Sequence, residues 1–222
     1  SKSCVQPLVR HVAGLTRATI REVEFATADV KQFTIDVASD FSHQPGQWVD
    51  VFLPEIDAVG GYSIASAPSQ VSEMGSITLA IKAAAHAPTE WMHRHATAGT
   101  ELLLRPGGSF IYEPPSSGRA VLLVAGGIGI TPIMSMMRHA TETEPIPRVT
   151  LAYSARLPSD FAFAEAIDDI AGTVRAGRFY AHLSVTRPET RHRRTMPPGS
   201  SAAPPAGNAK AAAQARAAAA AA

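Results

Sequence analysis

The sequence predicts an antiparallel β-barrel domain over residues 1–115, followed by an α/β domain with a parallel sheet over residues 116–190. The first part holds six short apolar or alternating runs separated by turn-forming residues, a pattern typical of a small antiparallel barrel or sandwich. In the second part, apolar runs alternate with helical patterns, which indicates parallel βαβ units in a Rossmann-like fold. Residues 191–222 are rich in Pro and Ala, and we expect a disordered tail, a lone helix or an insertion there.

The composition narrows the possible classes of protein. With 222 residues, of which 45% are hydrophobic, the chain can bury the core of one large domain or two modest ones. Twenty Lys and Arg against nineteen Asp and Glu leave a net charge of +1, which argues against a nucleic-acid-binding protein. The one cysteine, Cys4, excludes a disulfide framework and a Cys-rich zinc site.

One uncharged stretch, residues 120–137, is nearly long enough to cross a membrane. Glycines and polar residues interrupt it, so a strand, a turn and the start of a helix explain it better than a membrane span. The sequence begins at Ser1 without an apolar leader, and we expect any targeting peptide to be missing from this chain.

The barrel strands are expected at residues 12–25, 30–37, 47–53, 62–65, 77–82 and 100–104. Alternation of apolar and polar residues is clearest in Phe33–Val37 and Trp48–Phe52, and it predicts strands with one face toward a core. Turn-forming residues separate the runs at Pro45-Gly46, Gly60-Gly61, Gly75 and Pro106-Gly107-Gly108. A helix is expected over residues 88–95, because Pro88 and Thr89 suit its first positions.

The α/β domain begins with a continuous apolar run, Val121–Ala125, which is typical of a strand that is buried on both faces. The elements expected after it are a helix over 132–140, a strand over 149–153, a helix over 161–171 and a strand over 179–185. This β-α-β-α-β order is one mononucleotide-binding half of a doubly wound sheet.

A glycine-rich segment, residues 125–132, lies directly between the first of these strands and its helix. Glycines let a backbone approach a pyrophosphate closely, and a helix N-terminus offers N–H groups and a partial positive charge to phosphate. Thr131 can cap the helix and Pro132 suits its first turn. The segment differs from G-x-G-x-x-G, and the alternative interpretation is a tight βα turn without a ligand.

A second signal is the pair Tyr62-Ser63 within the segment from Gly60 to Pro68. An aromatic ring followed by a hydroxyl on a barrel strand can stack on a flat heterocycle and form a hydrogen bond with its edge. The alternative is an ordinary strand with one buried ring and one exposed hydroxyl.

In this order the two signals resemble the ferredoxin reductase superfamily of flavin-dependent NAD(P)H oxidoreductases, over residues 12–188. Residues 45–50 and 59–64 look most like the group of oxidoreductase NAD-binding domain-containing proteins. The resemblance implies FAD as cofactor, electron transfer from NAD(P)H to an unidentified acceptor, and a mitochondrial location. The alternative is a non-catalytic member of the fold that serves as a structural or assembly subunit of a larger complex.

The resemblance also implies roles for particular residues. On the flavin strand, Gly61 and Tyr62 would contact the ring, and Ser63 would be the catalytic residue, near the flavin nitrogen that exchanges hydride. The remaining flavin contacts would be the backbone at Ile81 and Lys82, and Thr89 by the phosphates. The nicotinamide nucleotide would bind at Gly126, Gly127, Gly129 and Thr131 with its pyrophosphate, and at Ser154, Arg156, Thr186 and Arg187 with its adenosine end.

The sequence departs from the superfamily in three places. Gly60 stands where the superfamily has an arginine that pairs with flavin phosphate, and Lys82 and Arg105 are candidates to replace that charge. Residues 85–89 lack the glycine that usually precedes the phosphate-side helix. The closing Cys-Gly-Pro-Pro segment near the nicotinamide is missing, so we expect a nucleotide domain that is incomplete at its C-terminal end.

Two further expectations concern the ligands. NADH is favoured over NADPH because residues 184–187 lack a dense basic pocket for a 2′-phosphate, although Arg187 leaves NADPH open. No metal site is expected, because His93 and His95 are two residues apart on a helix and fall on different faces.

Overall fold

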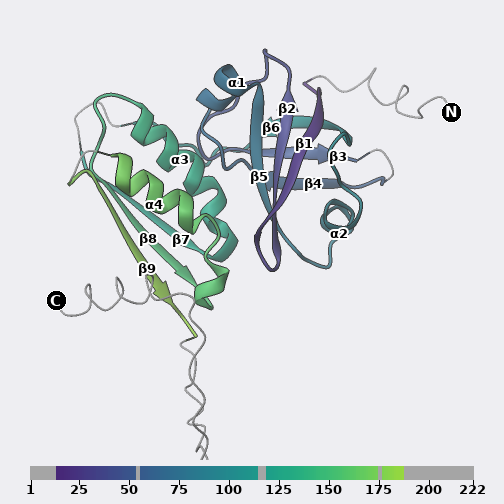
Figure 1. Cartoon of the computed structure of the whole chain (residues 1–222). Helices are drawn as coiled ribbons and strands as arrows, with labels where there is room; N and C mark the ends of the chain where they lie inside the picture. Colours follow the sequence, from purple (N-terminus) through teal and green to yellow (C-terminus); the bar gives the residue numbers. More distant parts are fainter. Residues whose placement is uncertain (1–13, 54–55, 115–118, 175–176, 188–222) are drawn as a thin grey trace, which may run out of the picture. The chain divides into compact units, whose positions relative to one another are not determined.

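The computed structural model describes residues 14–53, 56–114, 119–174 and 177–187. Cys4 and the tail that was predicted over residues 191–222 lie outside these ranges. Within them, two sheets form in succession along the chain (Figure 1).

The first sheet has six antiparallel strands in the order β4-β3-β6-β1-β2-β5. Its strands are β1 Thr16–Thr27, β2 Val30–Val37, β3 Trp48–Phe52, β4 Val59–Ser63, β5 Ser76–Lys82 and β6 Glu101–Gly107. Ile64, directly after β4, forms a bridge with Leu79 of β5, so the two edge strands of the sheet meet. This closure confirms the predicted antiparallel barrel.

Apolar side chains at alternate positions along the strands fill the barrel core, as the sequence pattern predicted. Phe33 and Ile35 of β2 and Val49 and Val51 of β3 are fully buried, while the residues between them are half-exposed. Helix α2, Ala87–Arg94, adds the fully buried Met92 to the same core. The predicted strand and helix positions therefore follow from period-two burial and from a proline at the helix start.

Three local features of the barrel differ from the expectation. A short helix, α1 Ser69–Met74, was not predicted, and Gly75 ends it with a left-handed φ of 63°. Gly60-Gly61 lies inside β4 instead of forming a turn, and Pro106 lies inside β6. A proline is tolerated there because β1 pairs only with residues 101–104 of β6, which leaves Pro106 bonded on one side alone.

The second sheet has three parallel strands in the order β7-β8-β9, as predicted. The strands are β7 Val121–Gly126, β8 Val149–Ala155 and β9 Phe179–Val185, joined by helices α3 Ile130–Glu142 and α4 Ala164–Thr173. Two short 3₁₀ turns, η2 Gly127–Gly129 and η3 Pro158–Asp160, follow β7 and β8. The α/β architecture predicted from the alternating pattern is confirmed.

The expected burial of β7 on both faces is wrong. Leu123 and Ala125 are buried, whereas Leu122 and Val124 are each 66% exposed. The reason is that α3 and α4 lie on the same face of the sheet (Figure 1).

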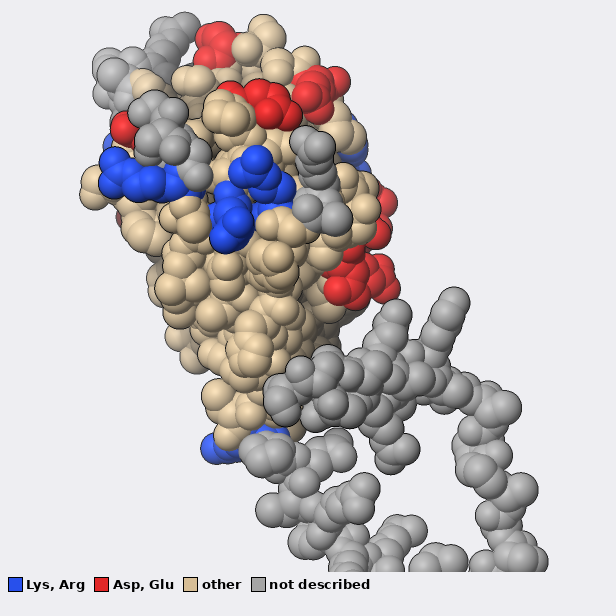
Figure 2. Space-filling model, turned by 90° about the vertical axis from the view of Figure 1, so that its left-hand side faces the viewer, with Lys and Arg blue, Asp and Glu red and all other residues tan. Residues whose placement is uncertain are grey.

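Figure 2 views the molecule from the side of β9 and shows charged side chains gathered toward the top, with a wide uncharged area below them.

None of the helices in the described ranges has the length and apolar character that crossing a bilayer requires. The hydrophobic core of the parallel sheet continues into the barrel, because Val30, Ala65 and Ala80 pack in the same cluster as residues of α3.

Candidate nucleotide and flavin site

The glycine-rich segment forms a short turn at the end of β7. Gly127 begins this turn with a left-handed φ of 50°, a conformation that favours glycine, and Gly129 immediately precedes α3. A Cβ atom placed on Gly127 or Gly129 would meet no atom within 4 Å. The space beside the turn is therefore open.

The prediction that Thr131 caps α3 is wrong. The helix begins at Ile130, one residue before Thr131, and Gly129 occupies the N-cap position without a side-chain hydrogen bond. The Thr131 side chain is buried, and its hydroxyl donates to the carbonyl oxygen of Ile128 at 2.8 Å. Thr131 therefore stabilises the turn through this hydrogen bond and does not cap the helix.

The turn opens on a cavity of about 200 Å³. Its predicted lining residues are Lys82, Gly126, Gly127, Ser154, Arg156 and Thr186. They meet because Gly126 pairs with Ser154 and Ser154 with Ser184, so the three parallel strands end together. Gly129, Thr131 and Arg187 were predicted with them, but they do not line this cavity.

Five further lining residues were not predicted from the sequence: Val30, Ile128, Ala155, Asp160 and Ala162. Asp160 ends the turn after β8, and its Oδ2 accepts a hydrogen bond from the backbone N–H of Leu157 at 3.2 Å. Asp160 could have been predicted from the sequence, because an acidic residue stands in the short turn after the second strand of the sheet. Val30 comes from the barrel, and no local pattern indicates that contact.

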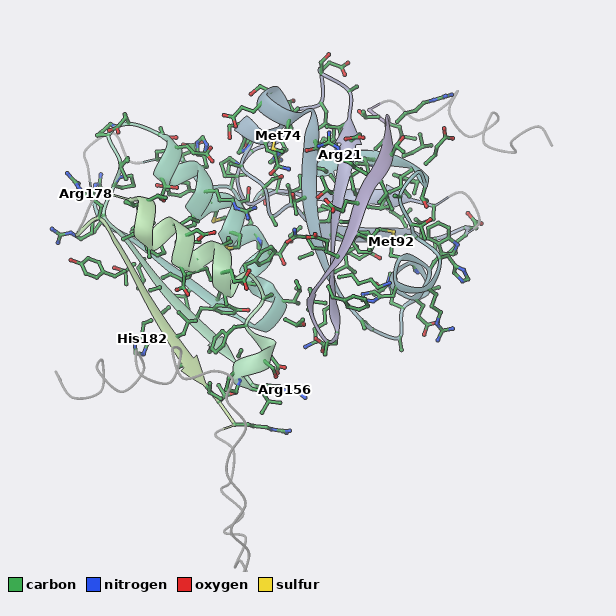
Figure 3. All side chains as sticks on the ribbon, viewed as in Figure 1. Arg21, Met74, Met92, Arg156, Arg178 and His182 are labelled. Carbon is green, nitrogen blue, oxygen red and sulfur yellow. The ribbon has the colours of Figure 1, made fainter. Side chains whose placement is uncertain are left out.

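The charges around the cavity are two cations and one carboxylate, from Lys82, Arg156 and Asp160. Lys82 Nζ lies 3.0 Å from Asp29 Oδ2, and this hydrogen bond is the main reason that the pKa of Asp29 is below its usual value. Arg156 is exposed and lies at the carboxyl end of the parallel strands, whereas Arg178 lies at the opposite end (Figure 3). Because Lys82 is paired with Asp29, Arg156 and Asp160 leave the charges around the cavity close to balanced.

The ring of Tyr62 fills the space that the side chain of residue 60 would occupy. A Cβ atom on Gly60 would lie 2.5 Å from the nearest Tyr62 ring atom. Tyr62 is only 9% exposed, and its hydroxyl lies 3.1 Å from Thr89 Oγ1, which is also buried. Burial raises the pKa of the Tyr62 hydroxyl, so the side chain is neutral at physiological pH.

The other predicted flavin contacts lie around this ring. Ser63 is half-buried and pairs with Trp48, while Gly61 lies on the same outer face, with its Cβ position 3.9 Å from the Trp48 ring. The backbone carbonyl of Ile81 accepts a hydrogen bond from His93 Nε2 at 2.9 Å. Arg105 is paired with Asp50 at 2.6 Å opposite Gly61, on the face away from Gly60, so it does not replace the missing arginine.

These contacts show what a flavin would require. Ser63 lies half-buried at the end of β4, and the carbonyl of Ile81 on β5 already accepts a hydrogen bond from His93. A ring stacked on Tyr62 needs exposed aromatic surface, and in the described conformation Tyr62 is only 9% exposed, with the tip of its ring over Gly60. The described conformation of Tyr62 therefore offers little ring surface for stacking.

Comparisons with known proteins agree with this fold. A model of the oxidoreductase NAD-binding domain family matches residues 123–198. Oxidoreductase NAD-binding domain-containing protein 1 of Danio rerio is 37% identical over 184 residues, which are 78% of this chain and 68% of that protein. The protein of the same name from Homo sapiens is 37% identical over 154 residues, and the match spans 64% of this chain and 49% of that protein.

Among solved structures, the FAD/NAD binding domain of nitric oxide dioxygenase from Vibrio cholerae superimposes with a TM-score of 0.65 at 18% identity. The match covers 82% of each chain. At this identity the likeness shows the ferredoxin reductase-like fold, with a barrel followed by a nucleotide-binding sheet.

Proposed function

The chain belongs to the family of oxidoreductase NAD-binding domain-containing protein 1, and on that premise we propose that it passes electrons from NAD(P)H through FAD to an acceptor. The observation that carries this proposal is the cavity at the carboxyl ends of the parallel strands, beside a glycine turn and an uncapped helix start.

In this proposal the turn holds the nucleotide by its backbone. Gly126 and Gly127 let the pyrophosphate approach, and the positive charges of Lys82 and Arg156 favour it electrostatically. The carboxylate of Asp160 accepts hydrogen bonds from sugar hydroxyls. Arg156 is the one arginine among the described lining residues, so we propose NADH as the donor ahead of NADPH.

On the barrel side, FAD would supply the hydride acceptor and would release electrons to the acceptor. Ser63 would form a hydrogen bond at the edge of the flavin ring, and Thr89 would face the phosphates once Tyr62 has turned away. The protein would align the two rings and exclude water between them. From the family resemblance, we propose a mitochondrial location.

One observation favours a second function. Gly60 lacks the phosphate-pairing cation, and Tyr62, which packs over it, is almost completely buried. A chain that never releases Tyr62 would bind a nucleotide without flavin, as a structural or assembly subunit of a larger complex.

The deciding experiment is a visible absorbance spectrum of the full-length protein, purified with excess FAD, before and after anaerobic addition of NADH. Flavin bands that bleach with NADH support the proposed oxidoreductase. A colourless protein that still binds NADH by calorimetry supports the assembly subunit, and a protein that binds neither overturns both.

The matched variants for this experiment are Arg156→Gln and Arg94→Gln, which remove exposed arginines inside and outside the cavity. Arg156→Gln is expected to weaken NADH binding about 5- to 20-fold, because it removes a charge-assisted contact with the ligand. Arg94→Gln should leave NADH affinity unchanged. Equal affinities for both variants would place the nucleotide elsewhere.

A further inference from the structure

Two side chains of α3 hold the backbone that follows Ser63. Ser135 Oγ donates to the carbonyl oxygen of Ser66 at 2.7 Å, and Arg138 Nη1 donates to the carbonyl oxygen of Ala65 at 3.0 Å. Ser135 and Ser66 are completely buried. Because α3 begins directly after the glycine turn, one helix connects that turn to the strand that carries Tyr62 and Ser63.

The segment that these side chains hold is also fixed within the barrel. The backbone N–H of Ala65 donates to the carbonyl of Thr78 at 2.8 Å, and the N–H of Thr78 donates to Ser66 Oγ at 3.0 Å. Ser66 therefore bonds to β5 through its hydroxyl and to α3 through its carbonyl. The segment has little freedom to shift relative to either element.

Arg138 makes its bond to the Ala65 carbonyl from a partly buried position. Its side chain is half-buried, and burial lowers the pKa of its guanidinium below the usual value. The guanidinium lies 5.9 Å from the centre of the Phe163 ring, immediately before α4, and the charge of Glu142, one turn further along α3, partly offsets the effect of burial on its pKa. A charge in this position carries a desolvation cost, which the bond to Ala65, the Phe163 ring and Glu142 offset.

We propose that Ser135 and Arg138 are positioning residues that set the distance between the flavin strand and the nucleotide turn. This inference rests on the proposed function. Hydride transfer depends steeply on the separation and alignment of the two rings, and a misplacement of about 1 Å costs up to about 100-fold in rate. Two hydrogen bonds from one helix fix that separation without touching either ligand.

The test uses the full chain loaded with FAD, with Ser135→Ala and Arg138→Met as variants. Stopped-flow single-turnover reduction by NADH should slow by about 10- to 100-fold in each, while the dissociation constants of NADH and FAD stay within about twofold. Arg138→Lys, which keeps a donor for the Ala65 carbonyl, should recover part of the rate. Amide hydrogen exchange should become faster at Ala65 and Thr78 in both variants, with or without flavin.

The matched controls remove similar bonds elsewhere. Arg21 Nη2 donates to the carbonyl of Met74 at 2.9 Å within the barrel and also pairs with Asp36, and Ser72 Oγ donates to the carbonyl of Ser69 within α1. Figure 3 labels Arg21 and Met74. Arg21→Met and Ser72→Ala should keep the wild-type rate of reduction and the wild-type exchange at Thr78.

The outcomes separate the inference from the function on which it rests. A wild-type chain that takes up no flavin, or is not reduced by NADH, overturns the proposed function and the inference together. A wild-type chain that is reduced, with unchanged rates in Ser135→Ala and Arg138→Met, overturns the inference alone. Variants that bind NADH or FAD more weakly but are reduced at the wild-type rate also overturn the inference. If Arg138→Met does not fold, the rate of reduction of the smaller variant, Ser135→Ala, still tests the inference.

Discussion

Glycine has opposite consequences in the barrel and at the parallel sheet. At Gly60 the space that a side chain would occupy is filled, because the Tyr62 ring lies in it and the Tyr62 hydroxyl bonds to Thr89. At Gly127 the space stays open and borders a cavity, and at Gly129 it is open as well. Of these glycines, Gly127 therefore leaves room for a ligand beside the cavity, and Gly60 does not.

The two regions also differ in how completely their strands are covered. Leu104 of the barrel is fully buried, whereas Leu122 of β7 is 66% exposed although both are apolar strand residues. Barrel strands enclose a common core, while the helices described here cover one face of the parallel sheet. Stability should therefore depend far more on inward barrel positions than on the uncovered face.

The largest expected effect tests this difference with the two leucines. Leu104→Ala should lower the free energy of unfolding by about 2–5 kcal/mol, because it leaves a cavity in a closed core. Leu122→Ala should change it by less than about 0.5 kcal/mol. Urea denaturation of the two variants measures both values, and similar losses would mean that the outer face of β7 is covered.

The next effect tests the glycine comparison. Gly60→Ala should destabilise the chain by about 1–3 kcal/mol, because the new Cβ would overlap the Tyr62 ring. Gly129→Ala, where nothing lies within 4 Å, should stay within about 0.5 kcal/mol of wild type. In a Tyr62→Ala background, Gly60→Ala should become nearly neutral. Thermal unfolding of this double-mutant cycle gives the coupling directly, and no coupling would show that Tyr62 does not occupy this space.

A smaller effect is expected from the hydroxyl that holds the ring in place. Tyr62→Phe removes the bond to Thr89 and should cost about 0.5–1.5 kcal/mol, whereas Tyr180→Phe, at an exposed position, should cost almost nothing. If the ring must leave for flavin to bind, Tyr62→Phe should also accelerate FAD uptake, followed by the change in flavin fluorescence. Slower uptake would show that the hydroxyl aids flavin binding.

Sequence reasoning located both regions because their signals are local. The alternation from Phe33 to Val37 predicts which side chains face the barrel core, and the apolar run at Val121–Ala125 followed by glycines predicts a strand and a phosphate-sized turn. An apolar run does not reveal how many faces a helix will cover, so the burial of Leu122 and Val124 was predicted wrongly.

Other features could not be predicted because they depend on contacts between distant segments. The packing of Tyr62 on Gly60 follows from both residues lying on the inner face of β4, opposite Thr89 of α2. The bond from Arg138 to Ala65 joins residues 73 positions apart. Single-sequence patterns report on neighbours in the chain, and here the barrel and the parallel sheet meet through residues without any local signature.

The smallest expected effect lies between the two regions, at His43. The ring is 7% exposed, its Nδ1 lies 3.3 Å from the carbonyl oxygen of Gln44, and its Nε2 has no hydrogen-bond partner in the described part of the chain. Burial lowers the pKa of His43 below its usual value near 6.5, and the nearby charge of His139 on α3 lowers it further.

The sign of the pH dependence follows from that direction. The unfolded chain binds a proton at His43 more readily than the folded chain, so the stability contributed by neutral His43 is complete above pH 6.5 and is lost as the pH falls below that value. The slope is at most about 1.4 kcal/mol per pH unit for one proton. Urea unfolding at pH 7.5 and 5.5 should therefore show a loss in wild type that His43→Phe reduces and that His182→Asn, at an exposed position on β9, leaves intact. An equal reduction by both variants would assign the pH dependence to groups other than the buried ring.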